Sequence, residues 1–185
     1  MREGLAGRRL TENNQQKGIT MFEHFSSADE LFRFRLASAL TMERDSLEML
    51  GELEGAAHDD ELKSMFRHHA EETRQQLDNL EEIFRLIGEE PNGAPSPTTK
   101  GLAKEGQSLI RKSDPAVVDD VVISAALGTE HYEISTYQTL IAAADALGAE
   151  DVQRLLKQNL DQEVHTSEEL AAAGKKFAMA TAGNR

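Results

Sequence analysis

The stretch EEPNGAPSPTTKG, from Glu89 to Gly101, holds three of the four prolines of this 185-residue chain. Proline removes a backbone donor and breaks helices, so this stretch predicts a connection and not a regular element. Before and after it, apolar residues recur every three or four positions, and strand-like alternation is missing. The sequence therefore predicts an all-α protein whose helices are interrupted near the middle of the chain.

Capping signals define four long helices on the two sides of this connection. Ser27 and Glu30 have the spacing of a capping box, and Asp59 is a good capping residue for the next helix. Asp114 followed by Pro115 predicts the start of the third helix, because proline is favoured at the first helical position. The predicted helices cover residues 28–55, 59–88, 114–147 and 150–176.

The lengths of the connections decide the predicted topology. A few residues join the first two helices, and a few join the last two, which makes each pair antiparallel neighbours. The connection from Glu89 to Ser113 is much longer, and its segment GLAKEGQSLIRK, residues 101–112, has helical character. Two hairpins joined by one long crossover predict a ferritin-like antiparallel four-helix bundle with a short extra helix in the crossover. A simple up-down bundle would not need this link.

The ends of the chain are expected to lie outside the bundle. We expect a disordered polar extension over residues 1–20, one ferritin-like bundle domain over residues 21–178, and a frayed tail over residues 179–185. The extension has no hydrophobic region of the kind found in secretory signals, and Met21 is an alternative start. No apolar run approaches the roughly 18–20 residues that a membrane span needs.

The composition excludes several classes of function. The chain has no cysteine, which excludes disulfides, thiolate metal sites and cysteine nucleophiles and is compatible with a reducing cytoplasm. Its 33 Asp and Glu outnumber its 20 Lys and Arg, for a formal net charge of -13. Such a surface repels nucleic acid and anionic lipid. We therefore expect a cytoplasmic protein without a nucleic-acid or membrane partner, for which cations are the natural small ligands.

Glutamates interrupt the apolar stripe of every long predicted helix near its middle. Steps of three and four residues along the stripes reach Glu43, Glu72, Glu130, Glu133 and Glu163. Helix midpoints share one height in an antiparallel bundle, so these carboxylates are expected to converge on one small volume. The alternative is that each lies at the edge of its stripe and extends to water, which is common for a single glutamate but less so for four at matching height.

Such a cluster needs a compensating charge. Burying an unpaired carboxylate costs several kcal/mol, and few Lys or Arg residues share the stripe positions. Metal ions are the simplest compensation, and carboxylates with one imidazole suit iron or manganese. We therefore expect a site for two iron ions, with manganese as the alternative.

Several motifs resemble the YciE/YciF family, also called DUF892. They are HHAEET at residues 68–73, DPAVVDDVVISAA at residues 114–126, GTEHYEISTY at residues 128–137 and LKQNLDQE at residues 156–163. The resemblance covers roughly residues 28–170. It implies a ferritin-like fold similar to the iron domain of rubrerythrin, and a ferroxidase or stress-response role. It also implies five ligand candidates: Glu43, Glu72, Glu130, Glu133 and Glu163.

Three further residues are candidates for additional ligands or for contacts with the ligands: His69, Gln76 and Tyr137. His69 belongs to the pattern of the family, and it is either a ligand or a hydrogen-bond partner of Glu72. Tyr137 is either a packed core residue or a donor to Glu130 or Glu133. Two other histidines lie beside the stripes and are expected at the surface or rim: His131 and His165.

The sequence also departs from the broader di-iron pattern, which has Glu-x-x-His on two helices. Gln75 stands three residues after Glu72, and Thr166 stands three residues after Glu163. Ser167 stands where an aspartate is expected one turn beyond Glu163.

Three functions are compatible with these observations. The first is a ferroxidase that oxidises ferrous iron with oxygen or peroxide, in which no catalytic residue is separate from the metal ligands. The second is a non-catalytic helical bundle, a scaffold or dimer with a degenerate metal site. The third is metal storage without turnover. We also expect a homodimer.

Overall fold

All regular structure in the described part of the chain, residues 24–183, is helical, which confirms the predicted all-α class. The computed structural model contains α1 (Ala28–Ala56), α2 (Asp60–Leu86), α3 (Pro97–Ile110), α4 (Val118–Ala146) and α5 (Glu150–Gly183). The predicted polar extension over residues 1–20 lies outside the described residues, and so do residues 184–185 of the predicted tail.

Side-chain caps begin both helices of the first hairpin. Ser27 Oγ accepts the backbone N–H of Glu30 at 3.1 Å, as the predicted capping box requires. The Glu30 carboxylate also accepts from the backbone N–H and the hydroxyl of Ser26. Asp59 Oδ1 accepts two backbone N–H groups at the start of α2. The helix ends before Gly88, whose φ of 77° suits a residue without a side chain.

The second hairpin differs from its predicted boundaries at both ends. The predicted cap at Asp114 and Pro115 is wrong, because a turn in which the Val117 N–H bonds to the Asp114 carbonyl precedes α4. The helix begins at Val118 without a side-chain cap. At the other end, α5 continues to Gly183, beyond the predicted end at Lys176. The alanine-rich sequence after Leu170 favours helix, which explains the extension.

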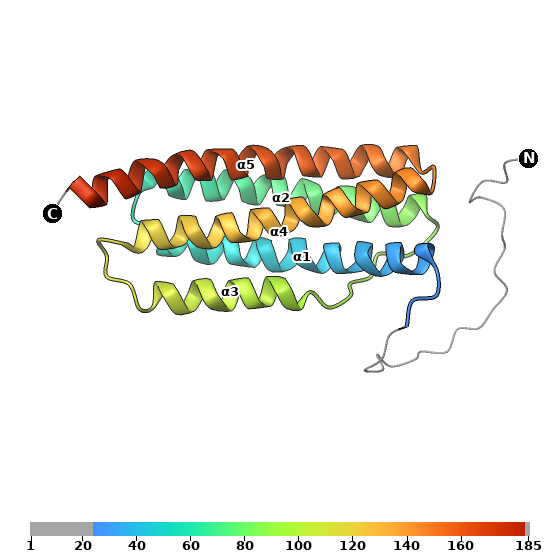
Figure 1. Ribbon diagram of the computed structural model, residues 1–185, viewed down its shortest axis with the longest axis horizontal. Coiled ribbons are helices and arrows are strands. Elements are labelled where there is room, and N and C mark those ends of the chain that lie inside the picture. The colour runs from blue at the N-terminus through green and yellow to red at the C-terminus, as the bar shows by residue number, and fades with distance from the viewer. Residues whose placement is uncertain (1–23, 184–185) are drawn as a thin grey trace, which may run out of the picture.

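The crossover returns the chain along the length of the bundle. In Figure 1, α2 ends at the opposite end of the molecule from the start of α4, and α3 runs between these two ends. The two hairpins pack side by side through α1 with α4 and α2 with α5, while α3 lies against α1 and α4. This is the predicted ferritin-like order, in which α2 and α4 run in the same direction.

The hydrophobic core is divided into two clusters. One contains Phe32, Leu36, Leu80, Phe84 and Leu156 among its members. The other contains Leu53, Leu62, Phe66, Val122 and Leu170 among its members. Between them, at mid-length, the long helices direct polar side chains inward, so the two apolar clusters flank a polar layer.

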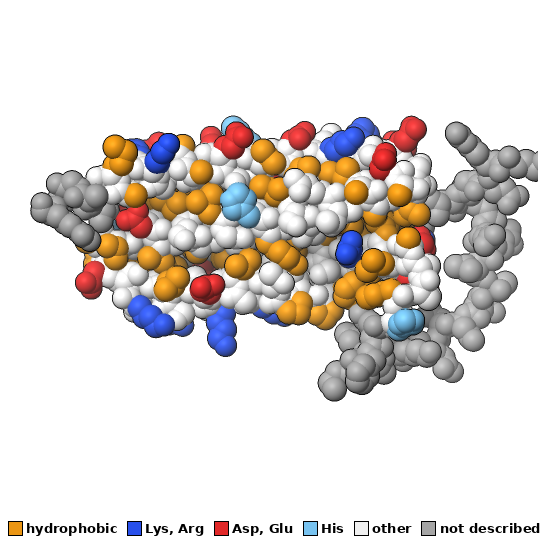
Figure 2. All heavy atoms as spheres, viewed as in Figure 1, with side chains coloured by type: hydrophobic (Ala, Val, Ile, Leu, Met, Phe, Trp, Pro, Cys, Tyr) orange, Lys and Arg blue, Asp and Glu red, His pale blue; other side chains and the backbone are white. Residues whose placement is uncertain are grey.

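The surface carries charges of both signs. Figure 2 shows Asp, Glu, Lys and Arg side chains interspersed with small apolar areas on one face. Among the described helices, none is long and apolar enough to cross a membrane.

Candidate metal centre

Four of the five predicted glutamates lie inside the bundle. Glu43, Glu130, Glu133 and Glu163 are each 1% exposed or less. They come from three helices, α1, α4 and α5, and reach the polar layer between the two apolar clusters. Glu72 of α2 differs, because 16% of its side chain is exposed.

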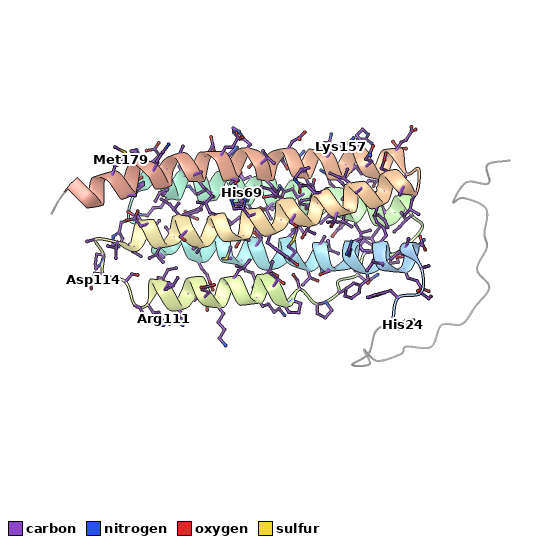
Figure 3. All side chains as sticks on the ribbon, viewed as in Figure 1. His24, His69, Arg111, Asp114, Lys157 and Met179 are labelled. Carbon is purple, nitrogen blue, oxygen red and sulfur yellow. The ribbon has the colours of Figure 1, made fainter. Side chains whose placement is uncertain are left out.

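His69 takes the inward position on α2. The buried polar residues of this helix are His69, Thr73 and Gln76, which follow one another at steps of four and three. Glu72 is partly exposed, and its carboxylate contacts the hydroxyl of Thr166, so it lies at the boundary between α2 and α5. Figure 3 shows His69 in the interior of the bundle near its mid-length, away from the labelled residues at the ends.

His69 forms a compact group with three of the carboxylates. One donor atom each from His69, Glu130, Glu133 and Glu163 lies within 4.8 Å of the others. His69 Nε2 lies 3.2 Å from Glu130 Oε1 and 3.6 Å from Glu163 Oε2. One imidazole and three carboxylates from α2, α4 and α5 thus surround a common point, a donor set that suits iron or manganese.

Glu43 belongs to an adjoining hydrogen-bond network. The Tyr137 hydroxyl donates to Glu43 Oε1 at 2.5 Å. Asn159 Nδ2 donates to the Tyr137 oxygen at 3.0 Å and to the backbone carbonyl of Gln76 at 3.2 Å. Of the two roles expected for Tyr137, the packed core residue is confirmed, because the side chain is fully buried in an apolar cluster. Its hydroxyl donates across the bundle to α1 and not to the alternative partners, Glu130 and Glu133.

Burial raises the pKa values of three of these carboxyls. Loss of hydration raises the pKa of Glu43 to about 7, although the Tyr137 hydrogen bond opposes this rise. Burial and the neighbouring carboxylates raise the pKa values of Glu133 and Glu163 well above their usual range. Burial also raises the pKa of Tyr137, with Glu43 adding to the effect. In the absence of a bound cation, the site therefore favours protonated carboxyls.

His69 and Glu72 shift in the directions expected of an ion pair. Burial alone would lower the pKa of His69, but the surrounding carboxylates, Glu130 first, raise it well above its ordinary value. The pKa of Glu72 is lowered, mainly by its contact with His69. A protonated His69 thus neutralises part of the negative charge of the buried carboxylates, and a metal ion would neutralise more of it.

Unpartnered oxygens show that the polar layer is incomplete by itself. Neither oxygen of Glu133 nor of Glu163 accepts a hydrogen bond of ordinary geometry, and one oxygen each of Glu43 and Glu130 is in the same position. Ser46 is near Glu133, and Glu130 and His69 are near Glu163. The side-chain amide of Gln76 has no partner on either of its polar atoms. Native proteins rarely bury such groups without an ion or water. The donor atoms present therefore fit a bound cation.

Two residues of this layer were missed in the sequence. Asn159 is fully buried and links Tyr137 to α2. It lies four residues before Glu163, so the same helical period that identified the glutamate also placed Asn159 on the inner face. Thr166 stands where the di-iron pattern has a histidine, and its hydroxyl lies 3.2 Å from His69 Nδ1. His131 and His165 are exposed, as predicted.

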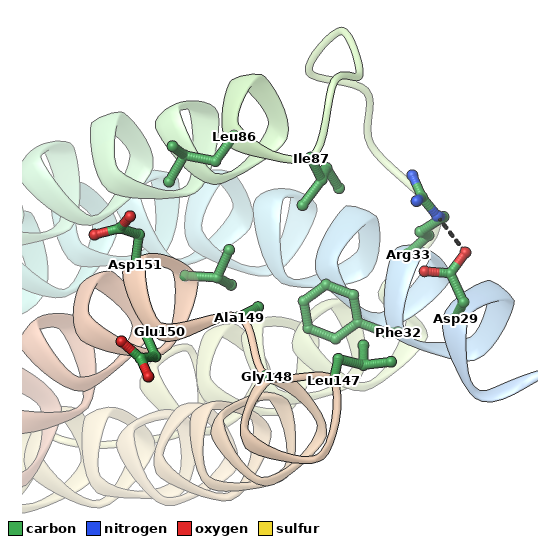
Figure 4. Close-up of a pocket in the computed structure, with 11 residues that line it drawn as sticks. Asp29, Phe32, Arg33, Leu86, Ile87, Leu147, Gly148, Ala149, Glu150 and Asp151 are labelled. Carbon is green, nitrogen blue, oxygen red and sulfur yellow. Dashed lines mark hydrogen bonds and ion pairs between the residues drawn. The ribbon is translucent and has the colours of Figure 1, made fainter. Parts of the chain in front are cut away.

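A separate pocket lies at one end of the bundle. Phe32, Ile87, Leu147 and Val152 line it, with Arg33 bonded to Asp29 at its edge (Figure 4). None of the four residues of the His69 group lines this pocket. It is therefore a different feature from the candidate metal centre.

Fold and site together define an all-α ferritin-like helical bundle with a buried His/Glu cluster at its centre. The profile described as "Domain of unknown function (DUF892)" matches residues 27–182, and the chain belongs to this family. Protein YciF of Escherichia coli (strain K12) is 28% identical over 148 residues, which are 77% of this chain and 87% of that protein.

Solved structures agree with this assignment. The E. coli stress protein YciF has a TM-score of 0.79 at 26% identity, and the match covers 83% of this chain and 98% of that one. YcfI from Rhodopseudomonas palustris, whose description suggests a structural role, has a TM-score of 0.77 at 31% identity, over 80% and 98% of the two chains. A two-domain Anabaena variabilis protein with DJ-1/ThiJ/PfpI-like and ferritin-like domains shares the fold, with a TM-score of 0.60 at 23% identity over 84% of this chain and 39% of that one.

Proposed function

We propose that this protein is a ferroxidase that binds two iron ions at the polar layer and oxidises them from the ferrous to the ferric state. The observation that supports this most is the set of buried carboxylate oxygens without partners on Glu133 and Glu163. Bound ferrous ions would each give one electron, either to hydrogen peroxide, which becomes two hydroxide ions, or to dioxygen, which with two protons becomes hydrogen peroxide. Manganese is the alternative metal, because the same donors suit it.

The residues of this chain would perform distinct tasks. His69, Glu130, Glu133 and Glu163 would hold the metal, because their donor atoms already lie within 4.8 Å of one another. Glu43 would add a further carboxylate, oriented by Tyr137. Their negative charge favours the ferric state over the ferrous state. The apolar clusters on both sides keep bulk water from the site and so strengthen these electrostatic interactions.

Metal binding and oxidation are tested separately. Ferrous iron is titrated into the metal-free protein without oxygen, bound iron is measured by elemental analysis, and oxygen is then admitted while ferric absorbance is recorded. We expect stoichiometric binding and oxidation faster than in buffer. A Glu130→Ala/Glu163→Ala variant should lose both, whereas Glu71→Ala, at an exposed position of α2, should retain both. Binding and oxidation no better than in buffer for the native protein would rule the proposal out.

The second candidate function is a non-catalytic bundle that acts as a scaffold or homodimer. The contact of His69 with Glu130 and Glu163 supports it, since a protonated imidazole partly neutralises the cluster without a metal. The structural role suggested for the R. palustris relative points the same way. On this alternative, Glu130→Ala raises stability and leaves the metal content unchanged. Light scattering tests the homodimer.

A cellular role follows only by analogy. The E. coli relative is described as a stress protein. We propose a stress-related, cytoplasmic role here, which would be tested by the survival of a deletion strain under peroxide.

A further inference from the structure

The boundary between α2 and α5 connects the buried His69 group with the surface. His69, Glu130, Glu133 and Glu163 are each 2% exposed or less, so a cation must pass a neighbouring residue to reach them. Glu72 is the predicted ligand that lies at this boundary, with 16% of its side chain exposed. It is not part of the compact group of donors.

Glu72 contacts one histidine on each side. Its Oε1 lies 3.7 Å from Nε2 of His68, whose side chain is 65% exposed. Its Oε2 lies 3.4 Å from Nδ1 of the buried His69. Thr166 of α5 closes the contact, because its hydroxyl lies 3.4 Å from the same carboxylate oxygen and 3.2 Å from His69 Nδ1. His68, Glu72 and His69 therefore form a continuous series of polar contacts from solvent to the interior.

His69 separates Glu72 from the cluster. One ring nitrogen, Nδ1, faces Glu72, and the other, Nε2, faces Glu130 at 3.2 Å. A cation held by Glu72 is thus one imidazole ring away from the buried carboxylates.

We propose that His68 and Glu72 form an outer cation site at which divalent transition-metal ions are captured before they pass His69 into the buried centre. The site takes a first-row divalent ion, because it offers an imidazole nitrogen and a carboxylate one helical turn apart. Glu72 then controls how fast the centre is loaded and emptied, and it is not a ligand in the loaded state. This inference rests on the proposed function, since it requires a metal in the centre.

The charge of Glu72 gives the proposal a kinetic consequence. A negative group at the mouth of a path raises the local cation concentration and the association rate. The same group lowers the barrier for departure, because the ion leaves through the same position. Removal of its charge should therefore slow both binding and release.

The test uses cobalt(II) chloride as the probe, because its visible absorption reports the ligands around the ion. Stopped-flow mixing gives the association rate, chelator competition gives the dissociation rate, and titration gives Kd. For Glu72→Gln we expect both rates to fall by about tenfold, with an unchanged cobalt spectrum. Glu72→Asp should recover part of the rate, and Glu71→Gln, at the exposed neighbouring position, should behave as the native protein.

Other outcomes separate the possible failures. A Kd raised about tenfold by Glu72→Gln with a changed cobalt spectrum would make Glu72 a ligand of the loaded centre and overturn the outer-site proposal. Unchanged rates would also overturn it. If the native protein binds no cobalt or iron, the proposed function itself fails, which is distinct from a failure of the access route.

Discussion

The Tyr137 hydroxyl on α4 donates a 2.5 Å hydrogen bond to Glu43 Oε1 on α1, across the interior of the bundle. This contact joins the two helical hairpins at the level of the carboxylate cluster. It also opposes the effect of burial on Glu43, because a hydrogen bond to a carboxylate favours its charged form. The hydrogen bond therefore links the two hairpins and favours the charged form of Glu43.

Removal of this hydroxyl should destabilise the metal-free protein. Tyr137→Phe leaves Glu43 Oε1 and one Asn159 N–H without their shared partner, and we expect a loss of about 1–3 kcal/mol in the free energy of unfolding. Urea denaturation measures it. Tyr132→Phe is the matched control on the same helix, and an equal loss in both variants would contradict the role assigned to the Tyr137 hydroxyl.

Stability of the metal-free protein should fall as the pH rises from about 5 to 8. The pKa of Glu43 is raised to about 7 in the folded state from 4.5, so the folded protein binds a proton that the unfolded chain has lost. The contribution of Glu43 to the free energy of unfolding is fully present below pH 4.5, the pKa of the unfolded chain. It is lost as the pH rises through the folded-state pKa of about 7. The raised pKa values of Glu133, Glu163 and His69 act in the same direction.

The size of this pH effect is testable. A shift from 4.5 to about 7 corresponds to about 3 kcal/mol for Glu43 alone. Urea denaturation of the chelator-treated protein at several pH values measures it, and Glu43→Gln should flatten the profile. A native stability that increases over this pH range would show that burial does not control these carboxyls.

Replacement of one cluster carboxylate by an apolar residue should separate stability from metal binding. Both oxygens of Glu133 are buried without partners, so Glu133→Met is expected to raise the stability of the metal-free protein at pH 8 by about 1–4 kcal/mol. The same change should lower the bound metal measured by elemental analysis. An increase in stability with an unchanged metal content would favour the non-catalytic bundle over the ferroxidase.

The Asp59 cap should stabilise the first hairpin independently of the metal. Its carboxylate accepts the N–H groups of Glu61 and Leu62, and Asp59→Ala is expected to lower stability by about 1 kcal/mol. Thermal denaturation with and without chelator measures it. The control is Asp78→Ala, at an exposed position within α2, which should have little effect. A loss that depends on metal would point to a different origin.

Helix positions and the bundle topology were predictable because their causes are local. Apolar residues at three- and four-residue steps indicate the helices, and Ser27 and Asp59 cap them. The long proline-containing connection from Glu89 excluded a simple up-down order. Three boundaries differed. The cap signal at Asp114 and Pro115 was misleading, because these residues form a turn before Val118. The helix α3 begins at Pro97, ahead of the predicted segment 101–112, and no side-chain cap or proline fixes the end of α5 at Gly183.

The sequence by itself determined that acidic side chains from α1, α4 and α5 lie inside, because their spacing continues the apolar stripes. Only the tertiary structure decided that His69, and not Glu72, faces them from α2, and that Tyr137 bonds to Glu43. His69 and Glu72 are three residues apart and so lie only about 60° from each other around the helix, which is why sequence spacing leaves the facing residue undecided. The packing of α2 against α5 sets the rotation of α2, and contacts between helices that are distant in sequence arise only once it is set.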